Sequence, residues 1–262
     1  MKYILWLWVL FLPAVSGAAE GKALQLTLTG EQYVGVQSDS ATRTELYADF
    51  IYKVDEAHTL RAVQGVSKLY DVAVIGEPEV QLGDLYLYHY WKPGWVWEGI
   101  ELTARSSLNV PVSEATRRHG VLTRPSLRVE LGRRFFSERL LLSYRPFVRY
   151  SWNRFTSTPD GAPLPLWTLG HGVYLEADLL SKVRLAGSYT AGMHTYEQVA
   201  AGAQSLGGNY EIDVSVLYQV TDAVMVRVGM NQADDFFKEG RFESNLYDPQ
   251  TTRYYLGVDV AL

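Results

Sequence analysis

Apolar and polar residues alternate with a period of two along most of this chain. Residues 210–220 show the pattern most clearly, with Tyr210, Ile212, Val214, Val216, Tyr218 and Val220 in one set and mainly polar residues between them. A β-strand places successive side chains on opposite faces, so the pattern predicts a strand with one apolar face. Residues 224–231 repeat it after a three-residue linker, which predicts an antiparallel hairpin.

The same alternation predicts an all-β chain of 12 strands, with 10 to 14 as the range, and no long amphipathic helix. The expected strands are residues 24–36, 44–54, 60–66, 81–91, 96–110, 126–132, 140–153, 167–179, 182–194, 210–220, 224–231 and 253–262. Several reach the about 9–11 residues that a tilted transmembrane strand requires, whereas strands of soluble domains average about five or six. Strand length therefore favours a membrane protein.

The connections between these strands alternate between short and long. Residues 55–58, 92–94, 134–139, 180–181 and 221–223 form short turns, and residues 67–80, 111–123, 154–166, 195–208 and 232–251 form long loops. Outer-membrane barrels have short periplasmic turns and long external loops. The pattern therefore predicts a transmembrane antiparallel up-and-down β-barrel, in which an even strand number leaves both termini on the periplasmic side.

The N-terminus has the order of a secretory signal peptide. Met1 and Lys2 precede an apolar run, and small residues follow at Ser16, Gly17 and Ala18. The run is shorter than the about 20 apolar residues that a transmembrane helix needs. We expect a signal peptide over residues 1–19 and one barrel domain over residues 20–262. Without any cysteine the mature chain has no disulfides.

Aromatic residues gather near both ends of the predicted strands. Trp152, Trp167, Tyr210 and Tyr254 lie near the long loops, and Tyr52, Trp91, Trp95, Phe135, Phe136 and Tyr218 lie near the short turns. Amphipathic rings at two levels are typical of the two interfaces of a membrane. We take Trp91, Trp152, Trp167, Tyr210, Tyr218 and Tyr254 as the candidate membrane-interface residues.

The last ten residues, RYYLGVDVAL, carry the apolar set Tyr254, Leu256, Val258, Val260 and Leu262 to the chain end. This stretch resembles the C-terminal insertion signal of Gram-negative outer-membrane proteins, although the family pattern most often ends in phenylalanine. With the signal peptide and the topology, the resemblance implies a porin-like integral protein of the outer membrane. It also implies contact with membrane lipid and lipopolysaccharide, and assembly by periplasmic chaperones and the barrel-assembly machinery.

The opposite set of each strand would line the lumen. Its basic members are Arg105, Arg128, Arg145, Arg149, Arg184 and Arg227, and its acidic members are Glu31, Glu45, Asp49, Glu101, Glu211, Asp213 and Asp259. The bases concentrate on the fifth to seventh strands and the acids on the far side of the ring. We therefore expect a transverse field across the lumen that sets selectivity for charged or dipolar solutes.

A passive channel for small hydrophilic solutes is the function that this lumen favours, with a plugged structural or surface-interaction barrel as the alternative. A lipid hydrolase is less favoured, because His171 on the apolar set has no serine among its expected neighbours. A soluble barrel with the two faces reversed also remains open. No cofactor or metal-loop spacing appears, and a net charge of -5 argues against a nucleic-acid partner.

Overall fold

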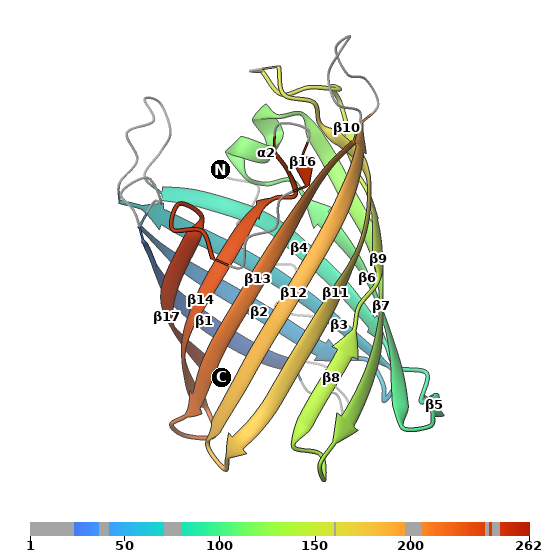
Figure 1. Cartoon of the computed structure of the whole chain (residues 1–262), viewed down its shortest axis with the longest axis vertical. Coiled ribbons are helices and arrows are strands. Elements are labelled where there is room, and N and C mark those ends of the chain that lie inside the picture. The colour runs from blue at the N-terminus through green and yellow to red at the C-terminus, as the bar shows by residue number, and fades with distance from the viewer. Residues whose placement is uncertain are drawn as a thin grey trace.

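The structure of this chain is a computed structural model that describes residues 24–36, 42–70, 80–159, 161–196, 206–238, 241–242 and 247–262. The predicted signal peptide lies outside the described residues. Within them, the chain forms a closed 12-strand antiparallel barrel (Figure 1). No helix in the described ranges is long and apolar enough to cross a membrane.

The wall is an up-and-down meander in which each strand pairs with its neighbours in sequence. Its strands are β1 (Leu24–Gly35), β2 (Arg43–Lys53), β3 (His58–Leu69), β4 (Val80–Trp91), β6 (Ile100–Val110), β7 (Val121–Phe135), the segment β8 (Leu140–Tyr144), β9 (Phe147–Tyr150) and β10 (Trp152–Asn153), β11 (Pro165–Leu180), β12 (Val183–Tyr196), β13 (Leu206–Gln219), β14 (Val224–Asp235) and β17 (Thr252–Ala261). The predicted fold class and strand order are confirmed.

The barrel closes where the last strand pairs with the first. β1 and β17 are antiparallel, with Thr27 opposite Ala261 and Gly35 opposite Arg253. The backbone N–H of Leu262 donates to the carbonyl oxygen of Leu26 at 2.8 Å. A strand can run to the chain end here because these hydrogen bonds offset the entropy of ordering the terminus. Closure also leaves no sheet edge that hydrocarbon would have to accommodate.

Several predicted strands have different bounds in the structure. Residues 126–132 extend to β7, which is 15 residues long, and residues 60–66 extend to the 12 residues of β3. Residues 96–110 divide into β5 (Val96–Trp97) and β6, because Glu98 and Gly99 adopt positive φ angles of 48° and 78° and form a tight turn. The connection between β4 and β6, which was predicted as a turn over residues 92–94, therefore extends from residue 92 to residue 99.

Proline accounts for the break in the seventh wall position. Pro146 lies between β8 and β9 and cannot donate a hydrogen bond to the neighbouring strand. The pairing on both sides of it keeps the same register, since Tyr144 faces Val173 and Phe147 faces Gly170 on β11. Residues 140–153, which were predicted as one strand, therefore fill a single strand position of the wall although they are divided into β8, β9 and β10.

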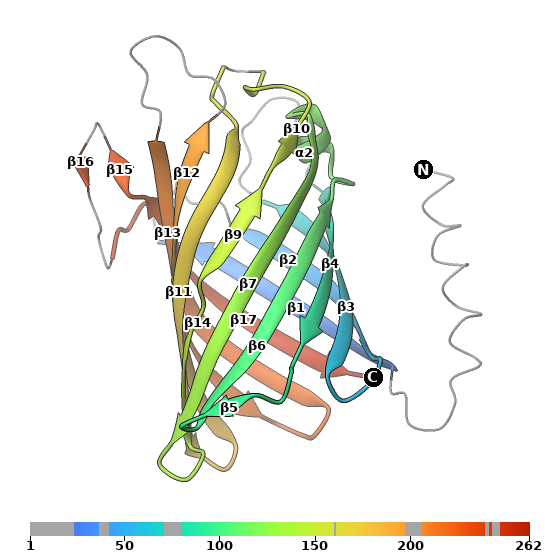
Figure 2. The same cartoon turned by 90° about the vertical axis from the view of Figure 1, so that its right-hand side faces the viewer.

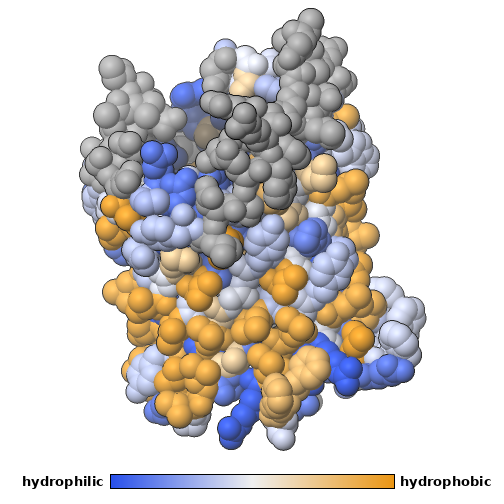
Figure 3. Space-filling view, in the orientation of Figure 1, coloured by the Kyte–Doolittle hydropathy of each residue, from blue (hydrophilic) through white to orange (hydrophobic). Residues whose placement is uncertain are grey.

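The two sets of alternating residues lie on opposite sides of this wall. On β17 the exposed residues are Tyr254, Leu256 and Val258, and the buried ones between them are Tyr255, Gly257 and Asp259. Figure 3 shows apolar residues forming a belt over the lower part of the outer surface. An apolar outer belt and a polar interior, on a closed barrel, are the architecture of integral proteins of the Gram-negative outer membrane.

Smaller elements lie in the long connections, at the end of the barrel opposite the short turns. α2 (Glu114–Arg118) lies in the connection from β6 to β7, and Ser113 caps its N-terminus by accepting from the backbone N–H of Thr116 at 3.1 Å. β15 (Phe237–Lys238) and β16 (Arg241–Phe242) pair with each other and stand outside the wall beside β13 (Figure 2).

Candidate functional site

An arginine cluster lines the lumen where β6, β7 and the start of β9 meet. Arg105 on β6 faces Arg128 on β7 across the strands, and Arg145 lies opposite Glu130 on the other side of β7. These residues belong to the polar set of their strands, so the period-two alternation points them inward. They border a cavity of about 240 Å³, together with Arg61, Tyr90 and Thr103.

Aromatic rings support these guanidinium groups without neutralising them. Arg105 Cζ lies 5.1 Å from the ring centre of Tyr88, Arg128 Cζ 5.3 Å from Phe147 and Arg145 Cζ 4.1 Å from Tyr174. The face of an aromatic ring attracts a cation but leaves its charge in place. Tyr86, Tyr88 and Tyr90 succeed one another along the inner side of β4, with centroids 6.3 and 6.2 Å apart.

Carboxylates compensate only part of this cluster. Arg145 Nη2 donates to Glu130 Oε1 at 2.8 Å, and Arg149 Nη2 lies 3.4 Å from the hydroxyl of Thr168. In the described part of the chain, Arg105, Arg128 and Arg149 form no ion pair with a carboxylate. This side of the lumen therefore carries a local excess of positive charge.

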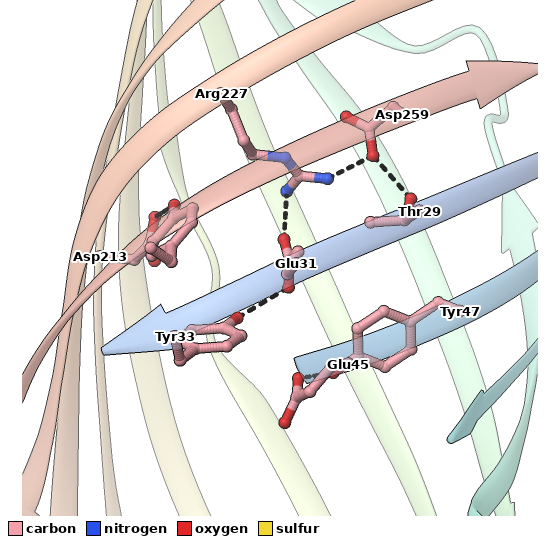
Figure 4. Close-up of polar contacts among 9 residues, drawn as sticks. Thr29, Glu31, Tyr33, Glu45, Tyr47, Asp213, Arg227 and Asp259 are labelled. Atoms are coloured by element: carbon pink, nitrogen blue, oxygen red, sulfur yellow. Dashed lines mark hydrogen bonds and ion pairs between the residues drawn. The ribbon is translucent and has the colours of Figure 1, made fainter. Parts of the chain in front are cut away.

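The opposite side holds its acids in a local network, which Figure 4 shows. Arg227 on β14 contacts Glu31 Oε1 at 3.2 Å and Asp259 Oδ1 at 2.5 Å, and so joins β14, β17 and β1. The hydroxyl of Tyr33 donates to Glu31 at 2.7 Å, and that of Thr29 donates to Asp259 at 2.6 Å. The negative charges of Glu31 and Asp259 are therefore balanced by partners in their immediate surroundings.

Most of the other predicted lumen acids also have nearby partners. Arg43 contacts Glu45 at 2.7 Å and Arg61 contacts Asp49 at 2.7 Å, while Arg184 contacts Glu176 and Asp178 at 3.3 and 2.9 Å. Asn231 donates to Glu211 at 2.9 Å and Tyr255 donates to Asp213 at 3.0 Å. The expected basic wall is therefore present, but the acidic wall opposite it is largely neutralised. Most of the acids have partners on the same or neighbouring strands, whereas several arginines have no carboxylate partner in the described residues.

A second cavity continues along the basic side. It measures about 280 Å³ and shares Tyr90, Thr103 and Glu130 with the first, adding Glu101 and Arg134 among its lining residues. Glu101, which lies on the same strand as Arg105, is therefore beside the arginine cluster. The sequence analysis did not include Arg61 among the lumen residues. Its position between the apolar, outward Leu60 and Ala62 is the signal that could have identified it.

Most of the candidate interface aromatics lie on the outer surface. Trp91, Trp152, Trp167, Tyr218 and Tyr254 are exposed there. Tyr210 is different, since it is 1% exposed and packs against Phe236 with ring centres 5.3 Å apart. The segment after β14 covers it, so the expectation that Tyr210 meets lipid is corrected. In the candidate insertion signal, Leu256, Val258 and Leu262 are exposed and Val260 is half-buried.

Two of the histidines, His171 and His194, lie on opposite faces of the wall. His171 is exposed on the outer face between Tyr144 and Tyr189, whose ring centres lie 5.9 and 6.3 Å away. Inside the barrel, His194 Nδ1 lies 2.9 Å from the hydroxyl of Thr168, but Thr168 is only 1% exposed. Among the described residues no group of three or more candidate ligands could hold a metal ion.

Comparisons with known proteins identify similar barrels. An outer membrane channel from Pseudomonas putida F1 aligns with a TM-score of 0.63 at 14% identity, over 94% of this chain and 97% of that one. The NanC porin aligns with a TM-score of 0.58 at 12% identity, over 90% and 100%. A KdgM porin in complex with disordered oligogalacturonate aligns with a TM-score of 0.52 at 9% identity, over 90% and 98%.

At these identities the likeness concerns the fold. No protein-family model matches the sequence, and no curated protein matches it. These three structures are outer-membrane proteins described as channels or porins, and the described part of this chain forms a barrel of the same kind.

Proposed function

We propose that this outer-membrane barrel is a passive channel for small hydrophilic solutes and that its lumen favours anions. The observation that carries the proposal is the direction of the ion pairs inside the barrel. Each ion pair among the described lumen residues joins two residues of the same strand, of adjacent strands, or of two strands with a single strand between them, as in the Arg227 network. None of these pairs crosses the lumen, so salt bridges between opposite walls do not fill it.

The uncompensated arginines supply the preference for anions. Arg105 and Arg128 face each other beside a cavity and have no carboxylate partner in the described ranges. A guanidinium keeps its charge at any physiological pH and presents several donors in a planar fork. Rings of such side chains select anions in pores. That a similar barrel was solved with oligogalacturonate, whose units carry carboxylates, agrees with this preference.

Conductance across a planar bilayer tests the proposal. The refolded protein should give stable ionic steps, and under a KCl gradient the reversal potential should have the sign of an anion-selective pore. The double variant Arg105→Gln with Arg128→Gln should move it toward cation selectivity. Arg133→Gln is the matched control, because Arg133 lies on the same strand but on the outer face. Silence at all voltages would refute the channel, and an unchanged potential in the double variant would refute the role of the arginines.

A blocked barrel is the second candidate, and one observation favours it. Asp84, on the inner side of β4, accepts from Asn109 Nδ2 at 3.0 Å, from the Ser113 backbone N–H at 2.9 Å and from the Thr116 hydroxyl at 2.7 Å. The bonds from Ser113 and Thr116 hold the loop that contains α2 against the lumen side of the rim, and the bond from Asn109 joins Asp84 to β6. If this loop closes the mouth, Asp84→Ala should convert a silent barrel into a conducting one.

A further inference from the structure

A patch of tryptophans lies on the outer surface at the short-turn end of β4, β6 and β7. β5 pairs only with β6 among the described strands and projects from the wall at the lower right of Figure 1. Trp95 is 66% exposed and Trp97 72% exposed, and both are far more exposed than a soluble surface would favour. We define the tryptophan patch as Trp91, Trp95, Trp97, Arg133 and Phe135.

Strand pairing places the members of this patch on the same face. Trp97 faces Ile100 on β6, and Ile100 faces Arg133 on β7. Because directly opposed residues of a sheet point to the same side, Trp97, Ile100 and Arg133 all point away from the lumen. The rings of Trp91 and Trp95 meet edge to face with centres 6.1 Å apart, which extends the patch toward β4.

Arg133 is the unusual member of this outer face. It is exposed, its guanidinium lies 5.2 Å from the ring centre of Phe135, and no ion pair joins it to a carboxylate in the described part of the chain. An arginine on the lipid face costs about 2–4 kcal/mol at the bilayer midplane and about 0–1 kcal/mol near an interface. Its position therefore fits the level of the lipid headgroups, which is also where tryptophan is enriched.

We propose that the tryptophan patch binds the phosphate of a phospholipid in the periplasmic leaflet, with a preference for an anionic headgroup. The guanidinium of Arg133 would hold the phosphate through paired N–H donors, and the indoles would contact the glycerol region and the first acyl carbons. The patch adjoins exposed apolar residues of the outer wall, Val96 between Trp95 and Trp97 and Leu131 two residues before Arg133, which points to lipid rather than a soluble protein as its occupant.

Tryptophan fluorescence can isolate this patch because residues 20–262 contain only two tryptophans outside it, Trp152 and Trp167. The parent for the test carries Trp152→Phe and Trp167→Phe and is reconstituted in bilayers. Quenching by brominated phosphatidylglycerol is compared with quenching by brominated phosphatidylcholine. Arg133→Gln is the test variant. Arg134→Gln is its matched control, because Arg134 is the adjacent arginine but lines the lumen. Heat-modifiable migration on gels verifies that each variant is folded.

We expect both lipids to quench the patch in the parent, with the anionic lipid preferred about five-fold, the factor that corresponds to about 1 kcal/mol per basic residue near a charged surface. Arg133→Gln should reduce the preference to near one, and Arg134→Gln should retain it. Absence of quenching would place the patch in water and overturn the proposal. Equal preference for the two lipids, equal losses in both variants, or abolition of the preference by added inorganic phosphate would also overturn it.

Discussion

Arg227 is expected to be the most important single charge for the stability of the barrel. It joins Glu31 and Asp259 across the seam between the first and last strands, and the side chains of these acids are only 8% and 11% exposed. Replacement by methionine keeps most of the apolar stem but removes the guanidinium. Two carboxylates would then remain buried close together, with hydroxyl donors from Tyr33 and Thr29 as their main compensation.

The magnitude follows from the burial of these acids. Removing one partner of a buried ion pair costs about 3–5 kcal/mol, and because the two hydroxyl donors remain we expect about 3 kcal/mol for Arg227→Met. Arg184 provides the contrast, since it is 45% exposed and its partners Glu176 and Asp178 are 19% and 43% exposed. Exposed pairs contribute about 0–1 kcal/mol, so Arg184→Met should change the free energy of unfolding by no more than about 1 kcal/mol.

Urea unfolding from lipid vesicles, followed by tryptophan fluorescence, measures both variants. The triple variant Arg227→Met, Glu31→Gln, Asp259→Asn should recover most of the lost stability, because it removes the buried negative charges as well. If the triple variant were as unstable as Arg227→Met, packing of the arginine stem rather than charge would explain the loss. If Arg227→Met cost no more than Arg184→Met, the reasoning from burial would be refuted.

Three further changes test other parts of the fold. Gly170→Ala should destabilise the barrel by about 1–3 kcal/mol in the same unfolding assay, because its Cβ would overlap the ring of Phe147; an unchanged midpoint would contradict this close contact. Asp84→Ala removes three hydrogen bonds, two of them from the loop at Ser113 and Thr116, and should speed tryptic cleavage after Arg117 about tenfold, whereas an equal rate would show that the loop is held elsewhere. Val258→Arg should cost about 2–4 kcal/mol in vesicles, and a loss below about 1 kcal/mol would mean that this position does not face acyl chains.

Strand order and sidedness could be predicted because both depend on local sequence. Residues on β17 alternate in exposure as the sequence alternates in polarity, from Tyr254 to Asp259. A slip of one residue would turn Arg227 and Asp259 toward lipid, so the polarity pattern itself specifies which face of the wall each residue occupies. The loops carried no comparable period, and the burial of Tyr210 beneath Phe236 depends on how the segment after β14 folds back over the wall.

The sequence by itself determined a closed antiparallel barrel with an apolar outer face and the inward direction of the charged residues in its polar set, because a period of two is a local property of the backbone. Only the tertiary structure decided which charges meet. Arg227 is 196 residues from Glu31 along the chain, and their contact exists because closure brings β14 and β1 to either side of β17. The same ring leaves Arg105 and Arg128 opposite each other without a carboxylate in the described residues. The balance of charge in the lumen is therefore set by register between strands, which no single segment of sequence contains.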